Sequence, residues 1–397
     1  MLSGTPVNIK TNIPPTEISG VFENLTWILP VTTEYYLAKT SFQDFLDRLR
    51  LDGYEVHGPV VRDNAIVYEL LSATESLPIG YRDQQSPGSY RLSKSDSPGD
   101  KYWFAWANGP QALKPYVFAP RESLWRAEKP DGHRVEFKQT LPSAKAKAIL
   151  GVRACDLAAL AIHDQHFLDS DYPDPQYHRR REDLFLIAVN CSHPASTCFC
   201  AATGDGPRAR AFNDLALTEL ETGFVVTVGS ERGQHLVQAL RLPAADSGQV
   251  NSAAQIIEEA TSVQQRKLPA HDIPMKLLSV LDDSYWQEIA QRCLSCSNCT
   301  SVCPTCFCYR EKTETAVDLQ SSDQFREWDS CFNQGHSYMH GITIRADTRS
   351  RYLQWLTHKF GTWNEQFGRS GCVGCGRCIS WCPAGIDIGV ELNRLCS

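Results

Sequence analysis

Cysteines are the residues of this 397-residue chain whose types and spacing could do chemistry. Eight of the 16 fall into two copies of one pattern near the C-terminus. In each copy three cysteines are separated by two residues, and a Cys-Pro pair follows after three more. The copies are Cys293, Cys296, Cys299 and Cys303, and Cys372, Cys375, Cys378 and Cys382. Thiolates at this spacing indicate ligands of [4Fe-4S] clusters, so the pattern predicts two such clusters.

The fourth cysteine of each copy is expected to bind the cluster of the other copy. Three closely spaced thiolates wrap one cubane, whereas a cysteine followed by proline is turned toward the neighbouring cluster, as in bacterial two-cluster ferredoxins. We therefore predict a first cluster on Cys293, Cys296, Cys299 and Cys382. The second cluster is predicted on Cys372, Cys375, Cys378 and Cys303.

Zinc and disulfides are the alternative uses of these eight cysteines. Zinc sites usually combine two Cys or His pairs that lie a dozen or more residues apart, which this pattern of triplets does not match. Disulfides need an oxidising compartment, but the N-terminal residues 1–6 have no basic or apolar region that would direct export. We therefore expect a reducing compartment, and the cytoplasm by default.

A second repetition predicts a third cluster. The sequence Thr-Cys-Phe-Cys occurs at residues 197–200 and again at residues 305–308. Near the first copy, two further cysteines follow predicted strands, and strand ends of an open sheet can meet at one edge. These observations favour a third [4Fe-4S] cluster on Cys155, Cys191, Cys198 and Cys200. A zinc ion that also uses His193, or simply four buried thiols, are the alternatives, and iron content distinguishes them.

The other four cysteines carry weaker signals. Cys306 and Cys308 follow Cys303 so closely that they are expected to line the pocket of the first cluster, and Cys331 stands alone. Cys396, next to the C-terminus, is expected to be a frayed or weakly packed thiol. A separate pair, His336 and His340, would share one face of a helix, where a structural or supporting role is expected rather than metal binding.

Composition excludes several classes of function. The chain is 42% hydrophobic with a formal net charge of −7, which does not favour a nucleic-acid partner, and it has no apolar run that could anchor it directly in a membrane. No Gly-x-Gly-x-x-Gly, P-loop or Gly-x-Ser-x-Gly motif occurs, so no nucleotide site or nucleophile is indicated. A chain with clusters and no catalytic residues is best interpreted as a conduit for electrons.

The elements that position these cysteines indicate an α+β protein with two domains. Residues 1–274 are predicted to form a mixed α/β domain, which includes a helix over 36–50, strands over 148–152, 184–190 and 223–229, and a polar helical linker over 244–270. Residues 86–100 have the composition of a loop. Residues 275–397 are predicted to form an all-helical, ferredoxin-like dicluster domain. The 68 residues between Cys303 and Cys372 need structure of their own, including a helix over 352–360.

Several of these motifs together resemble a known family. They comprise residues 151–157, 190–191, 197–200, 303–308, 328–331 and 372–378. In combination they resemble the beta subunits of soluble group 3 nickel-iron hydrogenases, also called sulfhydrogenases, and the A subunit of anaerobic sulfite reductase is similar. The resemblance covers roughly residues 100–390, and residues 1–100 carry no comparably sharp motif.

The resemblance implies a subunit that passes electrons between partners. One partner would be a flavin-bearing, NAD(P)-binding subunit, and the other the small and large subunits of a nickel-iron hydrogenase. An anaerobic sulfite reductase or another reductase core is the close alternative as catalytic partner. A zinc-stabilised scaffold protein is the alternative from a different class of function.

Overall fold

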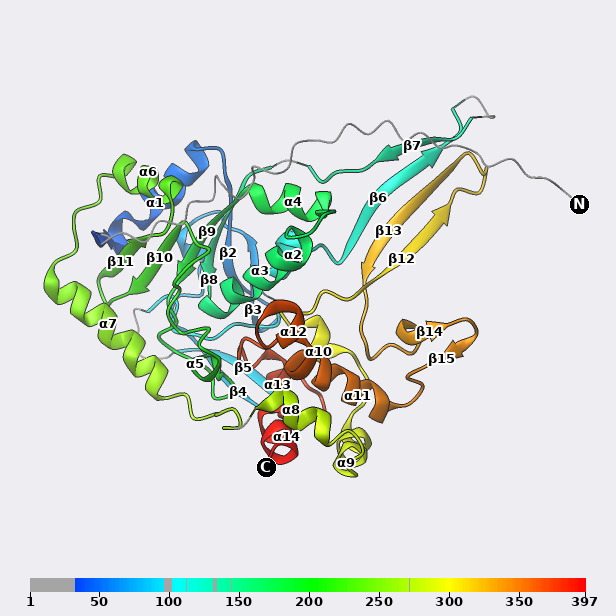
Figure 1. The fold of residues 1–397 in the computed structure, drawn as a ribbon. Coiled ribbons are helices and arrows are strands. Elements are labelled where there is room, and N and C mark those ends of the chain that lie inside the picture. Colours follow the sequence, from blue (N-terminus) through cyan, green and yellow to red (C-terminus); the bar gives the residue numbers. More distant parts are fainter. Residues whose placement is uncertain (1–32, 96–101, 112, 131–133, 144, 271) are drawn as a thin grey trace, which may run out of the picture.

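The computed structural model describes residues 33–95, 102–111, 113–130, 134–143, 145–270 and 272–397. Residues 1–6, which carry no predicted export signal, lie outside this set. A seven-stranded sheet occupies the first part of the chain, and short helices dominate the last part (Figure 1). The predicted α+β class is therefore confirmed.

The large sheet has a parallel centre. Its strand order is β1-β11-β10-β9-β8-β2-β3, and the pairs from β10 to β2 are parallel, whereas the outer pairs are antiparallel. The strands span Tyr35–Ala38, Gly223–Val228, Leu215–Glu219, Leu184–Val189, Lys147–Val152, Glu55–Arg62 and Ala65–Leu70, in the same order. The three strands predicted over residues 148–152, 184–190 and 223–229 are thus confirmed as β8, β9 and β11.

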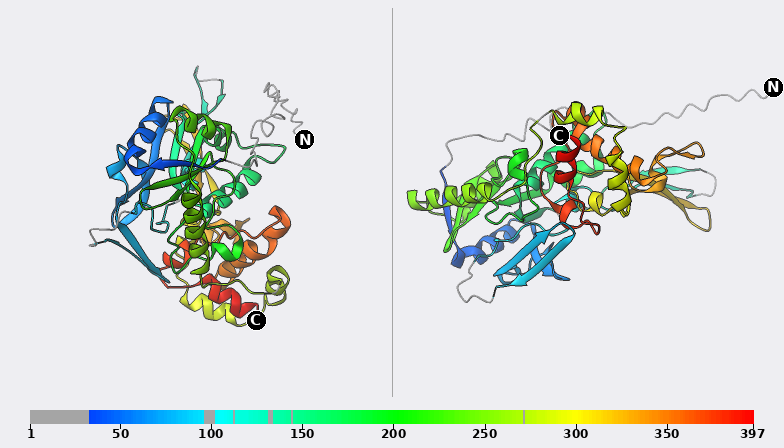
Figure 2. Two further views of the ribbon diagram at one scale, coloured as in Figure 1. Left: turned by 90° about the vertical axis from the view of Figure 1, so that its left-hand side faces the viewer. Right: turned by 90° about the horizontal axis from the view of Figure 1, so that it is seen from below.

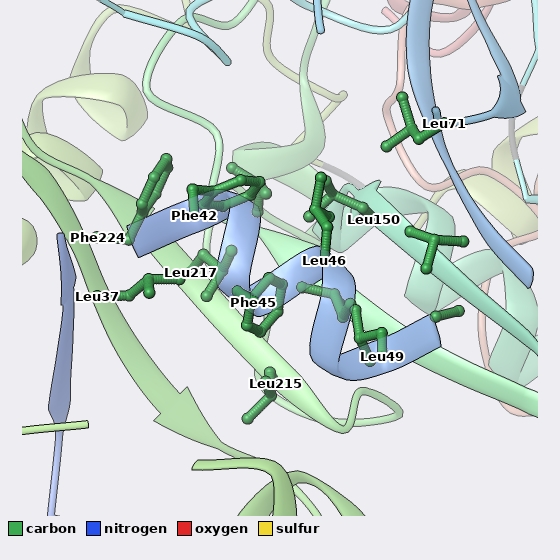
Figure 3. Close-up of a cluster of buried hydrophobic side chains, with 14 of the residues drawn as sticks. Leu37, Phe42, Phe45, Leu46, Leu49, Leu71, Leu150, Leu215, Leu217 and Phe224 are labelled. Atoms are coloured by element: carbon green, nitrogen blue, oxygen red, sulfur yellow. The ribbon is translucent and has the colours of Figure 1, made fainter. Parts of the chain in front are cut away.

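Helices cover both faces of this sheet, which explains why β9 is buried at every residue. Its residues Phe185 and Ile187 pack with α1 (Phe42–Leu51) in one core, shown in part in Figure 3. The alternate residues Leu184 and Leu186 pack in a second core on the other face. That core is completed by α2 (Lys114–Val117), α3 (Ala154–Phe167) and α4 (Pro175–Glu182), while α6 (Glu231–Ala239) joins the first core.

Two predictions for the N-terminal part need correction. The helix predicted over 36–50 begins only at Phe42, because residues 35–38 pair with β11 as strand β1. The predicted loop over 86–100 contains a strand, since β4 (Tyr81–Ser86) and β5 (Ser89–Lys94) form a hairpin, whereas residues 96–100 lie outside the described set. The hairpin reaches the C-terminal part, where the Gly88 amide donates to the Ile379 carbonyl at 3.0 Å; Figure 2 shows this proximity from below.

The C-terminal helices pack around an aromatic and aliphatic core. Trp286, Leu356 and Leu392 are buried in it and come from α9, α11 and α14. The helices are α8 (Ile273–Ser279), α9 (Tyr285–Arg292), α10 (Asn298–Ser301), α11 (Thr348–Thr357), α12 (Trp363–Phe367), α13 (Arg377–Ser380) and α14 (Ile388–Leu395). The helix predicted over 352–360 is formed by α11 and a π-helical turn at His358–Thr362 that continues it.

A second sheet joins the two parts and was not predicted. Its order is β12-β13-β6-β7, with strands Tyr309–Thr315, Ser321–Trp328, Arg121–Glu128 and Glu136–Gln139. It extends away from the large sheet as a long ribbon (Figure 1). The C-terminal part is therefore helical around its cysteines but not all-helical. The proposed boundary near residue 274 stays a prediction, and the linker over 244–270 contains the predicted helix as α7 (Ser247–Ser262).

Candidate metal centres

The first cysteine motif lies on a tight loop between two helices. Cys293 directly follows α9, and Cys299 is on α10. Between them Ser295 and Ser297 adopt left-handed backbone angles, with φ values of 49° and 67°. These turns bend the chain back on itself, as a peptide must do to present several thiols to one body. The Ser295 amide also donates a hydrogen bond to the Cys293 sulfur at 3.5 Å, which favours its thiolate.

The cavity beside this loop contains the fourth ligand that the spacing predicts. It is lined by Cys293, Cys296, Cys299 and Cys382, while Cys378 also reaches it. The rest of the lining is largely apolar and comes from the C-terminal core, including Phe332, Tyr352, Trp355, Ile386 and Ile388. Four thiols around an apolar cavity fit a [4Fe-4S] cluster. The structure thus brings together the four residues of the predicted first cluster.

The second motif is held in a loop that ends in α13. Gly374 and Gly376 have φ values of 63° and 73°, and each lies close to the backbone of the upstream Cys-Phe-Cys segment. A Cβ at Gly374 would come within 2.5 Å of the carbonyl carbon of Phe199. Both glycines are therefore required by conformation and by contact. The Gly374 amide donates to the Cys372 sulfur at 3.4 Å.

Cys303 lies beside the second motif, as the crossover of ligands predicts. Burial is the first cause that raises the pKa values of the Cys372, Cys375 and Cys378 thiols, and the neighbouring Cys303 thiol raises all three further. A bound iron atom would replace these protons, because thiolates are the ligands of iron. The four residues of the predicted second cluster are therefore neighbours in the structure.

A buried lysine faces the second set of cysteines. The ammonium of Lys359, on the π-helical turn, donates to Thr305 Oγ1 at 2.9 Å, to the Gly371 carbonyl at 3.0 Å and to the Cys303 sulfur at 3.5 Å. Burial lowers its pKa, but the negative charges of Cys303 and Cys306 outweigh burial and raise the pKa overall. A charged lysine in this place stabilises an anionic cluster. No spacing in the sequence pointed to Lys359.

The predicted third set is also brought together, at the carboxyl edge of the parallel strands. Cys155 follows β8 at the start of α3, and Cys191 follows β9. The pKa of the Cys198 thiol is raised mainly by burial, and further by the negative charges of Cys200 and Cys191. The pKa of Cys155 is raised by burial and, among other charges, by Cys200. The Gln264 amide donates to the Cys200 sulfur at 3.5 Å, a contact that could tune a bound cluster.

This third set touches the second one directly. The Phe199 amide donates to the Gly374 carbonyl at 2.8 Å, and the Cys198 thiol lies 3.7 Å from the Cys375 carbonyl oxygen. Arg377 is fully buried between the two sets, and its guanidinium pairs with the carboxylate of Asp156 at 2.8 Å. The cysteine sets are therefore contiguous, with a buried ion pair at their junction.

The prediction for Cys396 is wrong, and so is the expectation that Cys306 and Cys308 line the cavity of the first set, whose lining does not include them. Cys396 is not frayed but buried in the C-terminal core, and its amide donates to the Leu392 carbonyl. His336 and His340 do not share a helical face. His336 lies on a short 3-10 helix (Gln334–Ser337), and His340 is in the turn between β14 (Tyr338–Met339) and β15 (Ile342–Thr343).

Comparison with known proteins assigns the cofactor type of the two motifs. Residues 292–386 match the family model described as the 4Fe-4S dicluster domain. The chain carries a 4Fe-4S dicluster domain. Iron-sulfur clusters are thus its cofactors, and the predicted use of the motifs for such clusters is confirmed, whereas the number of clusters and their individual ligands stay predictions.

A curated relative extends the likeness beyond this domain. The chain is 28% identical over 351 residues to sulfhydrogenase 2 subunit beta of Pyrococcus furiosus, which covers 87% of this chain and 93% of the relative. The expected resemblance to hydrogenase beta subunits is therefore confirmed. No solved structure matches the chain significantly. In the part of the chain that the structure describes, no helix is long and apolar enough to cross a membrane.

Proposed function

We propose that this chain is the iron-sulfur electron-transfer subunit of a sulfhydrogenase-type complex. The dicluster domain supplies one-electron carriers, and the relative that matches nearly the whole chain is named as a sulfhydrogenase beta subunit. The chain would hold a first cluster on Cys293, Cys296, Cys299 and Cys382, a second on Cys372, Cys375, Cys378 and Cys303, and a third on Cys155, Cys191, Cys198 and Cys200. Its expected compartment is the cytoplasm, where thiols stay reduced.

The contact between the second and third cysteine sets carries this proposal. A cluster that served only to stabilise the fold would need no neighbouring cluster. Electron transfer, in contrast, needs clusters that lie one after another in space. The hydrogen bond from Phe199 to Gly374 fixes the Cys-Phe-Cys segment against the loop of the second motif. The buried ion pair of Arg377 and Asp156 lies at the same junction. This arrangement supports a relay that runs from the N-terminal part through the second cluster to the first.

The partners follow from the two ends of such a relay. We propose that a flavin-bearing, NAD(P)-binding subunit docks at one end, and the small and large subunits of a nickel-iron hydrogenase at the other. The role of this chain is to hold the clusters at fixed positions and to set their potentials through burial, charge and hydrogen bonds to sulfur. Chemistry on hydrogen and on the nicotinamide cofactor belongs to the partners.

Anaerobic purification of the tagged full chain from its native host tests the proposal. We expect a nickel-containing large subunit and a flavoprotein to co-purify in stoichiometric amounts. A siroheme protein in place of the nickel subunit would support a sulfite reductase core instead. A purified chain that is colourless, lacks absorbance near 400 nm and gives no EPR signal after reduction would refute an electron-transfer role altogether.

A further inference from the structure

A further group of metal-binding side chains lies outside the three predicted sets. Cys306 and Cys308 precede β12, and Cys331 follows β13. These strands pair antiparallel, with Tyr309 opposite Trp328, so the start of β12 and the end of β13 lie side by side. The backbone amide of residue 329 extends this pairing by donating to the Cys308 carbonyl at 2.9 Å. The ribbon therefore brings cysteines together that are far apart in the sequence.

Cys331 lies two residues beyond Asp329, whose amide is bonded to the Cys308 carbonyl. Burial raises the pKa of Cys331 to about 12, and the charge of Cys308 is the next cause. Cys306 and Cys308 both line a cavity of about 80 Å³, together with the side chain of Lys114. The volume of this cavity is several times the volume that one water molecule needs, so the cavity has room for more than a single atom.

His336 completes the group, and its ring is oriented by a carboxylate. Nδ1 of His336 lies 2.9 Å from the Asp329 carboxylate, and the ring also hydrogen-bonds the Cys308 thiol. Asn333 holds the same carboxylate through its side-chain amide. A carboxylate on one ring nitrogen, with the other nitrogen directed at the remaining ligands, is how proteins orient a metal-binding histidine.

A buried positive charge faces this group. The side chain of Lys114 is 5% exposed, its ammonium lies 3.8 Å from the centre of the Trp328 ring, and it donates to the carbonyls of Ser301 and Cys306 at 3.2 and 3.3 Å. A cation beside two cysteines favours their thiolate form, which is the form that binds metal. Cys306 and Cys308 line the cavity directly, and Cys331 and His336 belong to the loop that lines it through Asp329, Ser330 and Asn333.

We propose that Cys306, Cys308, Cys331 and His336 hold a fourth [4Fe-4S] cluster, with three thiolate ligands and one imidazole ligand. In the described part of the chain, no three His, Cys, Asp or Glu side chains are arranged to hold a single metal ion, and this includes the cysteines of the dicluster domain. A cubane differs because each of its ligands binds a separate iron atom. The role of this site in electron transfer rests on the proposed function, whereas the assignment of its ligands does not.

The position of this site defines its role in the relay. The residues next to Cys299 of the first set and next to Cys331 are in contact, because the Thr300 hydroxyl donates to Ser330 Oγ at 2.8 Å. Beyond His336, the turn formed by β14 and β15 exposes Tyr338, Met339 and Ile342. One electron would pass from the reduced first cluster, which is thereby oxidised, to the oxidised fourth cluster, with no bond or proton transferred. This site is thus the exit of the relay toward a partner.

Iron and sulfide analysis of the anaerobically reconstituted full chain tests the site. We expect about sixteen irons per chain, and about twelve in the Cys308→Ser/Cys331→Ser double variant, with the EPR signals of the other clusters retained. Cys396→Ser, which removes a buried thiol outside all four sets, is the matched control and should keep about sixteen. An iron content that does not fall by about four in the double variant, whatever the wild-type total, would overturn the proposal.

A second variant keeps the test informative if the double variant fails to fold. His336→Ala removes only the nitrogen ligand, so we expect loss of a strongly coupled nitrogen signal in pulsed EPR of the reduced protein. Persistence of that signal would refute ligation by His336. Stoichiometric zinc at this site in elemental analysis would refute the cluster. Each of these results is independent of which partners co-purify, so failure of this site is distinguishable from failure of the proposed function.

Discussion

The buried ammonium of Lys359 provides the sharpest test of how this chain sets a cluster potential. Replacement of Lys359 by Met keeps most of the side-chain volume but removes the charge that contacts the Cys303 sulfur at 3.5 Å. A reduced cluster carries one more negative charge than an oxidised one, so a nearby cation stabilises the reduced form. Removal of the cation should therefore lower the midpoint potential of the second cluster.

The size of this shift follows from Coulomb's law. The middle of a bound cluster lies further from Lys359 than the Cys303 sulfur does, and we take roughly 7 Å for the distance to the added electron. At an effective dielectric constant of about 20, the interaction is then about 2.4 kcal/mol. Because about 1.4 kcal/mol corresponds to about 59 mV for one electron, the expected change is about −100 mV.

Redox titration followed by EPR measures this shift cluster by cluster. The second cluster should move by about −100 mV in Lys359→Met, and the first cluster by less, because its ligands are further from the ammonium. Lys145→Met is the matched control, since this lysine is exposed and pairs with Glu55 outside all the cysteine sets. An unchanged or higher potential of the second cluster, at full iron content, would refute the reasoning.

Three further predictions concern the ligand crossover and the junction between the cysteine sets. Cys382→Ser should damage the first cluster and Cys303→Ser the second, as seen by EPR, and loss of the other cluster in either variant would refute the crossover. Asp156→Asn leaves Arg377 as an unpaired buried charge and should lower the free energy of unfolding by about 3 kcal/mol in denaturant titrations, whereas an unchanged stability would contradict this. Gly374→Ala should displace the Cys-Phe-Cys segment and reduce iron content, while Gly368→Ala, with a similar φ of +69° but nothing within 4 Å, should not.

The spacing of the cysteines was sufficient to predict most of the candidate site. Motif spacing alone placed Cys382 with the first cysteine set, and that is where the cavity lies. Strand propensity placed Cys155 and Cys191 at neighbouring strand ends, because consecutive buried runs of β-branched and aliphatic residues predict parallel strands. These features depend on local sequence, so the sequence alone was sufficient to find them.

Features that depend on distant parts of the chain were missed. Strand β12 is polar and largely exposed, and β13 is polar and mostly half-buried, so nothing in their sequence distinguishes them from a loop until β13 pairs with β6. Lys359 has an ordinary helical neighbourhood in the sequence, and its contact with Cys303 arises only from packing. His336 and Cys331 meet Cys308 for the same reason, since the ribbon brings them together.

The pairing of β13 with β6 means that this protein cannot be divided at the start of its helices. The two strands pair from Ser321 opposite Glu128 to Glu327 opposite Arg121, with a shift of register between Gln324 and Phe325. A fragment that begins at residue 275 would expose the unpaired edge of β13, and such edges promote aggregation. During synthesis, β6 is made about 200 residues before its partner strand β13, so the two strands can pair only after β13 has been made. We therefore expect cluster loading in the C-terminal part to follow completion of the whole chain.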